Sequence, residues 1–302
     1  MSNYQLQTIS QVGAARDNGD TQVVPTSSEI PGTKHFFWRA KSPTATVYFM
    51  GSIHIRKNTP LQVPEIVEKC FDESNYVGFE YDLTQEGQIR KAAGPYIQAH
   101  GTYPPGDSLA NHLTPAQWHQ LQMMLKEEGI KEETASRLKP FYLSATLFGN
   151  SAQKGGLSYE KGIDEIFCRK SQAAKKPIFG MEFWYEPLEA TESLTDQEQA
   201  SFLFSTSKGA TNSSRFMDEI LADWKTGNTT DMDSLVNSGV SPGDKAIMDK
   251  IIKFRNEKWL RQLDRVFRGS GTYFIVVGSG HLVGAYGLPS LLVQKGYQVE
   301  QF

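Results

Sequence analysis

The fold is decided by two similar stretches of the sequence, TVYFMGSIH at residues 46–54 and TYFIVVGSGH at residues 272–281. Each is a short run of β-branched and aromatic residues that ends in the pattern Gly-Ser-x-His. Such a run predicts a buried β-strand. The glycine after each strand, Gly51 or Gly278, is expected to allow backbone conformations that a side chain would forbid. Each histidine, His54 or His281, then lies just past the carboxyl end of a strand, where open α/β sheets bind their ligands.

We expect the two histidines to share one site. A single Gly-x-x-His is a weak pattern, but two of the six histidines of the chain fall in this context. The two strands are the most apolar in the sequence, which predicts central positions, burial on both faces, and adjacency or near adjacency. Glu80 is then expected to approach from the strand on the other side of His54. Rings separated by more than about 12 Å could not be joined by one metal ion or one water.

Composition limits the class of protein. The chain has 302 residues, of which 22% are charged and 39% hydrophobic, as is typical of a soluble globular protein. The formal net charge is −3, and no Lys/Arg block supports nucleic-acid binding. Cys70 and Cys168 form no Cys-x-x-Cys pattern. Residues 1–28 contain no signal-peptide core, and no window is apolar for the length of a membrane span. A trimmed signal would leave the same sequence, so cytoplasmic and exported locations both stay open, as does the oligomeric state.

The order of elements predicts an α/β fold with a central, mostly parallel β-sheet, flanking helices and helical insertions. We expect a flexible arm at residues 1–33 and a single domain at residues 34–302. Residues 36–40 are expected to form an edge strand that pairs as a hairpin with residues 46–50. Further strands are expected at residues 75–82, 176–182 and 297–302, and helical blocks at 84–150 and 187–268. Each block follows a strand that ends in a carboxylate, so both blocks are expected to flank the site and shape its mouth.

Four strand ends carry groups that can do chemistry: His54, Glu80, Glu182 and His281. Two imidazoles and two carboxylates suit a divalent metal such as zinc, manganese or iron. They equally suit metal-free chemistry, in which a carboxylate orients a histidine base toward water. The spacing does not choose between these readings. No His-Glu-x-x-His helix is present, so the metalloproteases defined by that motif are not supported.

Two more residues are candidates for the site. Asp164 stands at the start of an expected helix, and we favour a helix-capping role over a role in the site. Arg255 lies on a helix and would ordinarily be a surface charge. It is followed by Asn256, with Trp259 one turn on, so it could instead face the site and hold an anionic group.

These motifs together resemble the TraB/PrgY/GumN family, which includes the Tiki proteases. The similarity runs from about residue 36 to residue 302, with every motif in order. One departure is the aromatic run after Glu182, where a small polar residue and then a Gln are common in the family. The motifs that carry the resemblance are FWR at 37–39, TVYFMGSIH at 46–54, GFEYD at 78–82, GID at 162–164, KPIFGME at 176–182, RN at 255–256 and VGSGHLVG at 277–284.

The resemblance implies a fold like that of erythromycin esterases and the haem-binding ChaN proteins. It also implies a divalent-metal-dependent peptidase with manganese, cobalt or zinc as the metal. His54, Glu80 and His281 carry over from the family motifs as site residues, and Glu182, Asp164 and Arg255 match them less closely. The leading hypothesis is therefore a metal-dependent hydrolase with His54, His281, Glu80 and Glu182 as metal ligands, and with His54, His281, Glu80 and Arg255 in catalysis. The alternatives are a peptide- or haem-binding protein without turnover and a metal-independent esterase.

Overall fold

The computed structural model describes residues 23–25, 34–210, 213–237 and 242–302. Of the expected N-terminal arm at residues 1–33, it describes β1 (Val23–Pro25), which pairs in parallel with β5 (Leu61–Val63). The remainder of that arm lies outside the described residues, and so do residues 211–212 and 238–241 of the second expected helical block. The expectation of a single domain over residues 34–302 stays a prediction.

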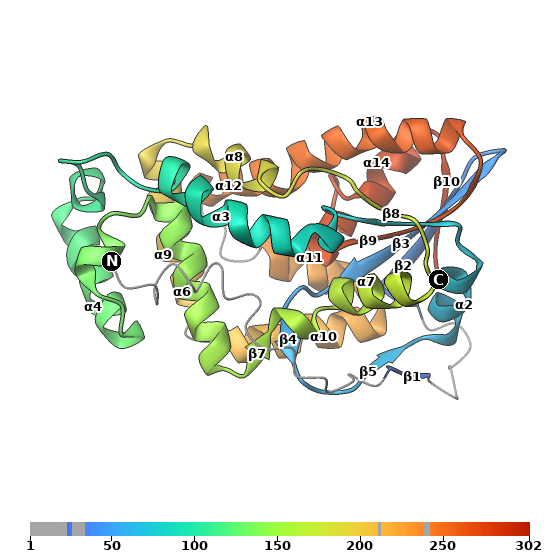
Figure 1. The fold of residues 1–302 in the computed structure, drawn as a ribbon, viewed down its shortest axis with the longest axis horizontal. Coiled ribbons are helices and arrows are strands. Elements are labelled where there is room, and N and C mark those ends of the chain that lie inside the picture. The colour runs from blue at the N-terminus through green and yellow to red at the C-terminus, as the bar shows by residue number, and fades with distance from the viewer. Residues whose placement is uncertain (1–22, 26–33, 211–212, 238–241) are drawn as a thin grey trace.

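A six-stranded sheet forms the centre of the described chain, in the order β10-β2-β3-β9-β6-β8 (Figure 1). The four strands β3, β9, β6 and β8 pair in parallel. Strand β2 pairs antiparallel with β3, and β10 pairs antiparallel with β2, so β2 alone of the six runs in the opposite direction. The prediction of an α/β fold with a mostly parallel sheet is therefore confirmed. The strands are β2 (Phe37–Lys41), β3 (Ala45–Ser52), β6 (Tyr76–Phe79), β8 (Ile178–Gly180), β9 (Gly271–Gly278) and β10 (Gln298–Gln301).

The two motif strands β3 and β9 are direct neighbours in the middle of the sheet. Their register places Ser52 opposite Gly278, so the two Gly-Ser-x-His motifs leave the sheet within one residue of each other. This adjacency confirms the expectation of central, paired strands. One expectation about the order is wrong: Glu80 follows β6, which pairs with β9, so it approaches from beyond the strand of His281 rather than beyond that of His54. The reason is that β9, the later strand in the sequence, is inserted between β3 and β6.

The hairpin of β2 and β3 forms as expected, but β2 is not the edge of the sheet. The last strand, β10, pairs antiparallel with β2 and takes the edge position. The ring of Phe302 packs against that of Phe37 at 5.5 Å between centroids, and Glu300 forms an ion pair with Arg39. A free strand edge exposes unpaired backbone groups, and β10 pairs with those of β2.

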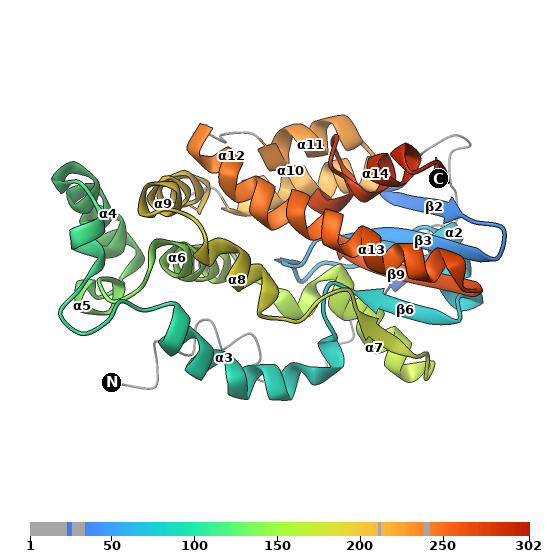
Figure 2. The same ribbon diagram turned by 90° about the horizontal axis from the view of Figure 1, so that it is seen from above.

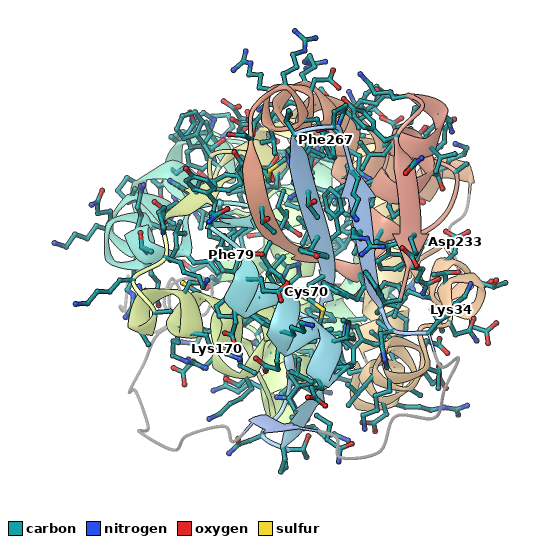
Figure 3. The ribbon with its side chains drawn as sticks, turned by 90° about the vertical axis from the view of Figure 1, so that its right-hand side faces the viewer. Lys34, Cys70, Phe79, Lys170, Asp233 and Phe267 are labelled. Atoms are coloured by element: carbon teal, nitrogen blue, oxygen red, sulfur yellow. The ribbon has the colours of Figure 1, made fainter. Side chains whose placement is uncertain are left out.

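Helices cover both faces of the sheet. The helices α2 (Glu65–Glu73) and α7 (Ile163–Ala173) lie on one face, and α13 (Phe254–Arg268) and α14 (Leu288–Gln294) lie on the other (Figures 1 and 3). In Figure 3, Phe267 marks the end of α13 above the strands, and Cys70 lies in α2 below them. Each helix is amphipathic; Trp259, Leu263 and Phe267, at intervals of four, form the buried stripe of α13. Cys70 and Cys168 are both buried and free.

The first helical block leaves the sheet at Leu83 and forms its own small core. It contains α3 (Glu86–His100), α4 (Pro115–Glu128), α5 (Glu132–Ala135) and α6 (Pro140–Lys154). As the sequence indicates, Thr114 begins α4 with a capping box. Leu109, Leu121 and Leu143 belong to a hydrophobic cluster separate from that of the sheet. Figure 2 shows this block extending away from the strands.

The second block returns across the same edge of the sheet. It contains α8 (Glu186–Glu192), α9 (Asp196–Ala210), α10 (Ser213–Thr226), α11 (Thr229–Asn237) and α12 (Pro242–Met248), and a π-helical segment, Asp249–Lys253, joins it to α13. The indole of Trp224 in α10 donates a hydrogen bond to the carbonyl oxygen of Gly51 at 2.7 Å. The second block thus contacts the end of β3, whereas none of the residues that line the pocket described below comes from residues 84–150 or 187–268. That the two blocks shape the mouth of the site stays a prediction. Among the described residues, no helix is both long and apolar enough to cross a membrane.

His112 lies between the two helical blocks and contacts both of them. The Nδ1 atom of His112 lies 2.6 Å from a carboxylate oxygen of Asp196, and its Nε2 atom lies 2.9 Å from one of Asp107. Tyr103 stacks on the imidazole with 4.3 Å between the ring centroids. Because Asp107 and Asp196 belong to different blocks, the imidazole links them.

Candidate functional site

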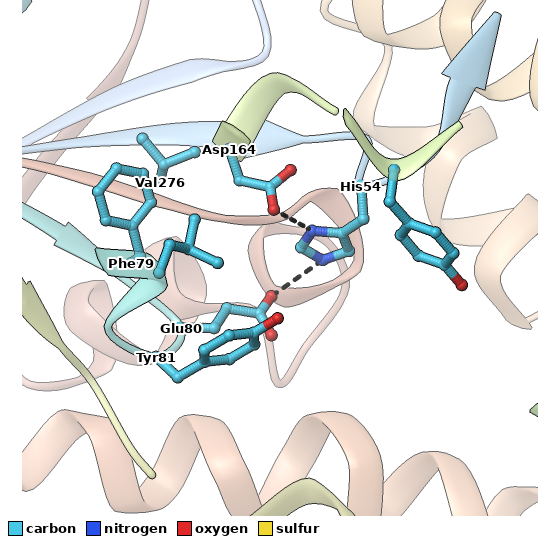
Figure 4. A pocket seen from close by; sticks show the side chains of 8 residues that line it. His54, Phe79, Glu80, Tyr81, Asp164 and Val276 are labelled. Atoms are coloured by element: carbon cyan, nitrogen blue, oxygen red, sulfur yellow. Dashed lines mark ion pairs between the residues drawn. The ribbon is translucent and has the colours of Figure 1, made fainter. Parts of the chain in front are cut away.

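His54 lies between two carboxylates at the carboxyl edge of the sheet (Figure 4). Its Nδ1 atom is 3.2 Å from Oδ2 of Asp164, and its Nε2 atom is 3.2 Å from Oε1 of Glu80. The His54 side chain is 42% exposed, whereas those of Glu80 and Asp164 are 13% and 18% exposed. The imidazole is therefore held by groups set deeper in the fold and still presents one side to solvent.

Asp164 belongs to this cluster and does not cap its helix. The N-cap residue of α7 is Gly162, and no side chain caps the helix there. Instead, Oδ1 of Asp164 accepts a hydrogen bond from Oγ of Ser52 at 2.7 Å, and the backbone N–H of Asp164 donates to the same Oγ at 3.1 Å. A Cβ at Gly162 would lie 2.5 Å from the carbonyl oxygen of His54, so the glycine lets the helix start approach the motif. The capping interpretation was wrong.

Glu80 connects the two histidine motifs. Its Oε1 atom accepts a hydrogen bond from the backbone N–H of Gly278 at 2.7 Å and faces Nε2 of His54. The same oxygen is 3.7 Å from Nε2 of His281. The Oε2 atom accepts a hydrogen bond from Nη2 of Arg255 at 2.7 Å. One carboxylate thus joins both imidazoles, and the two rings meet within the range expected for a shared site.

His281 is fixed in one orientation by Asn256. The side-chain amide nitrogen of Asn256 donates to the carbonyl oxygens of His281 and Tyr286 at 3.1 and 2.7 Å, which leaves its Oδ1 as an acceptor. This Oδ1 is 2.7 Å from Nδ1 of His281, so Nδ1 carries the proton and Nε2 carries the lone pair. The Nε2 atom faces Nη1 of Arg255 at 3.1 Å. The ring packs against Trp259 with 4.4 Å between centroids.

Glu182 lies behind the cluster and is enclosed. Its side chain is 0% exposed. The Oε1 atom accepts hydrogen bonds from Nε and Nη2 of Arg255 at 2.9 and 2.5 Å, and Oε2 accepts one from the indole of Trp259 at 3.1 Å. Both carboxylate oxygens therefore have protein donors, and Arg255 faces inward from α13 rather than toward solvent.

These contacts set the charges of the site. Burial alone would lower the pKa of His54, but the carboxylates of Asp164 and Glu80 raise it well above its usual range. Burial would raise the pKa values of Glu80 and Asp164; the cations beside them, Arg255 for Glu80 and His54 for Asp164, lower both. Burial and the nearby guanidinium lower the pKa of His281 to about 3. The two histidines therefore differ: their surroundings favour the protonated form of His54 and the neutral form of His281.

The two motif glycines are required by close packing rather than by an unusual backbone. Gly278 has φ −52° and ψ 138°, a conformation open to any residue, and Gly51 likewise lies outside the left-handed region. A Cβ at Gly278 would lie 2.7 Å from Nε2 of His54 and 3.0 Å from Oε1 of Glu80. A Cβ at Gly51 would lie 2.4 Å from the ring of Phe36. The conformational reason inferred from the sequence is thus replaced by a steric one.

A pocket of about 220 Å³ opens on the exposed side of His54 (Figure 4). Its polar wall is the group of His54, Glu80 and Asp164. Burial raises the pKa values of the two lining tyrosines, Tyr81 and Tyr159, so their hydroxyls stay neutral. The remaining lining residues are Phe79, Leu83 and Val276. Sequence reasoning missed Tyr159, for which no signal existed, and Ser52, which the shared Gly-Ser-x-His pattern could have indicated.

The four expected metal ligands do not fit a metal ion as they are arranged. Glu182 has both oxygens bonded to protein donors, and Nε2 of His281 faces a guanidinium N–H. In the described part of the chain, no group of three or more His, Cys, Asp and Glu side chains is arranged to hold a metal. The structure brings His54, Glu80, His281, Glu182 and Arg255 together, and their catalytic and metal-binding roles stay predictions.

Comparison with known proteins gives one family. The sequence model of the TraB/PrgY/gumN family matches residues 36–301 of the chain. "Uncharacterized protein YbaP" of Escherichia coli (strain K12) is 22% identical over 263 residues, covering 87% of this chain and 89% of that protein. An uncharacterized protein of Treponema pallidum (strain Nichols) is 20% identical over 275 residues, covering 85% of this chain and 80% of that protein.

One relative has a functional name. "Metalloprotease TIKI2" of Danio rerio is 21% identical over 349 residues. The match covers 96% of this chain and 65% of the Danio rerio protein, which therefore extends well beyond it. No solved structure matches the chain.

Proposed function

Because the chain belongs to the TraB/PrgY/gumN family, we propose that it is a hydrolase whose reaction takes place in the pocket at the carboxyl edge of the sheet. Peptides are the proposed substrate class. A relative named as a metalloprotease supports hydrolysis as the reaction and peptides as the substrate class. The pocket volume, about 220 Å³, is smaller than the roughly 300–1,000 Å³ of pockets that enclose a drug-sized ligand, so the pocket would hold only part of a peptide.

The observation that carries the proposal is the position of His54. Its imidazole lies in a pocket wall, 3.2 Å from Glu80 on one side and 3.2 Å from Asp164 on the other. His112 also lies between two carboxylates, but His54 differs from it in two ways: it lines a pocket, and its partner Glu80 also contacts the second histidine motif. Neighbouring charges raise the pKa of His54 and lower that of Glu80, and such shifts cluster at functional sites.

In the proposed reaction, Glu80 and His54 act as a proton-transfer pair. A water molecule in the pocket attacks the substrate carbonyl carbon and gives a proton to the Glu80 carboxylate. The imidazolium of His54 gives the proton on Nε2 to the leaving nitrogen as the C–N bond breaks. The proton on Glu80 then passes to Nε2 of His54 across their 3.2 Å contact, which restores both groups. Asp164 keeps the imidazole oriented and charged.

Dependence on a divalent metal, with manganese, cobalt or zinc as candidates, is the finer form of the proposal. The name of the Danio rerio relative supports it. The present arrangement of Glu182, His281 and Arg255 does not, so the reaction above uses only groups of this chain. Chelation separates the two forms: metal-dependent turnover stops in excess chelator and returns with added manganese, cobalt or zinc, whereas turnover by the chain's own groups continues.

The proposal is tested by incubating the protein with a peptide mixture and detecting cleavage by mass spectrometry, with Glu80→Gln as the active-site variant. The amide keeps the shape of the side chain but cannot accept the proton from water, so cleavage should fall by at least about 10²-fold. Glu86→Gln, at a 45% exposed position on α3, is the matched control and should cleave normally. Equal cleavage by the folded Glu80→Gln variant would refute the assignment.

A further inference from the structure

The guanidinium of Arg255 lies among the side chains that the metal hypothesis treats as ligands. The side chain is 8% exposed and enters the cluster from the first turn of α13. Its guanidinium contacts Glu80 at Oε2, Glu182 at Oε1 and His281 at Nε2. These are three of the four residues that the sequence indicates as metal ligands. The fourth, His54, lies on the far side of Glu80.

Each nitrogen of this guanidinium has a partner. The Nε atom donates to Glu182, and Nη2 donates to both Glu182 and Glu80. The Nη1 atom donates to the carbonyl oxygen of Ile251 at 3.0 Å and faces Nε2 of His281. The Ile251 carbonyl belongs to the π-helical segment Asp249–Lys253. The wider turn of that segment thus provides one of the contacts that holds the guanidinium in place.

The side chains that face the Arg255 guanidinium already have their charge and hydrogen-bonding partners. Two buried carboxylates face one buried cation, and the lone pair on Nε2 of His281 receives an N–H. A divalent ion bound to Glu80 and His281 would have to displace these bonds and would lie next to a fixed positive charge, which repels it. The planar guanidinium, which stays protonated in proteins, is suited to this bridging position, whereas a lysine would provide a single point of charge.

We infer that Arg255 is the built-in cation of this cluster and that it keeps divalent metal ions out of the site formed by Glu80, Glu182 and His281. The inference rests on the proposal that this cluster belongs to the hydrolytic site. It gives the proposed hydrolase a positioning residue in place of a cofactor: the guanidinium holds Glu80 by Oε2 and leaves Oε1 to His54 and the backbone of Gly278.

The experiment is a titration of the purified, chelator-treated full chain with Co²⁺, followed by calorimetry and by the visible absorption of bound cobalt. The variants are Arg255→Met, which removes the charge and keeps the length, and Arg261→Met, an exposed arginine on the same helix, as the control. Wild type and the control should bind Co²⁺ at least about 10-fold more weakly than Arg255→Met. Adding His281→Ala to Arg255→Met should abolish the gained binding.

Wild-type protein that binds one Co²⁺ per chain as tightly as Arg255→Met, and loses it in His281→Ala, would overturn the inference. Should Arg255→Met fail to fold, the wild-type titration decides alone: one equivalent bound through His281 overturns the inference, and none bound supports it. Peptide cleavage is measured separately. Cleavage that stops on chelation, together with cobalt bound by wild type, would refute the built-in cation while leaving the hydrolase proposal in place.

Discussion

Replacing Gly278 by alanine adds one methyl group at the most crowded point of the proposed site. The new Cβ would lie 2.7 Å from Nε2 of His54, whereas ordinary contact begins at 3.4 Å, so the imidazole must move by about 0.7 Å. A misplacement of about 1 Å in a catalytic group can cost roughly 10²-fold in rate. We expect kcat/KM for peptide cleavage to fall by about this factor, which corresponds to about 2.7 kcal/mol of transition-state stabilisation.

Stability should change much less than activity. The backbone at Gly278, with φ −52° and ψ 138°, accepts alanine without strain, so only overpacking of about 1–3 kcal/mol is added. Urea denaturation followed by circular dichroism measures this term. Gly280→Ala is the matched control in the same motif, because its Cβ would meet Ile252 and Val236 at 3.4–3.7 Å. A folded Gly278→Ala variant with kcat/KM within threefold of wild type would refute the role given to the His54–Glu80 contact.

Two further predictions concern the histidines that lie between carboxylates. Asp164→Asn removes the largest influence that raises the pKa of His54, so the alkaline limb of the kcat/KM profile should move to lower pH; an unmoved limb would show that His54 is not the proton donor. Burial opposes protonation of His112, but Asp196 and Asp107 raise its pKa above 6.5. The stabilisation is then complete below pH 6.5 and is lost as pH rises through the higher folded-state pKa. In urea denaturation, the free energy of unfolding of wild type should exceed that of His112→Gln by up to about 1 kcal/mol at pH 5.5 and by less at pH 9. The difference is small because Asp196 is 56% exposed. An equal difference at both pH values would contradict this prediction.

The strands and their pairing could be predicted because the information is local. The runs before Gly51 and Gly278 are apolar, short and bounded by turn residues, and two strands buried on both faces belong in the middle of a sheet. The order of the other strands could not be predicted in the same way. Nothing near Glu80 states that its strand pairs with β9 rather than β3, because that choice depends on packing between segments far apart in the sequence.

The site was predictable in part for the same reason. His54, Glu80 and His281 stand at strand ends, and the topology brings such ends to one edge. Asp164 was misinterpreted because an aspartate at a helix start usually caps the helix, whereas here Gly162 has that position and the carboxylate is free to contact His54. Tyr159 reaches the pocket from a 3₁₀ turn, Tyr159–Lys161, whose position is set by tertiary packing alone.

The insertion of β9 between β3 and β6 has a consequence for how the chain is made. Until residue 271 has been synthesised, the β2–β3 hairpin and the β6–β8 pair have no strand to join them. Ribosomes add roughly 5–20 residues per second, so these pieces wait until β9 has been made, and pairing of such distant segments is intrinsically slow. A nascent chain therefore carries His54 and Glu80 without His281, and the proposed hydrolase gains its complete reaction centre only after residues 271–281 have been made.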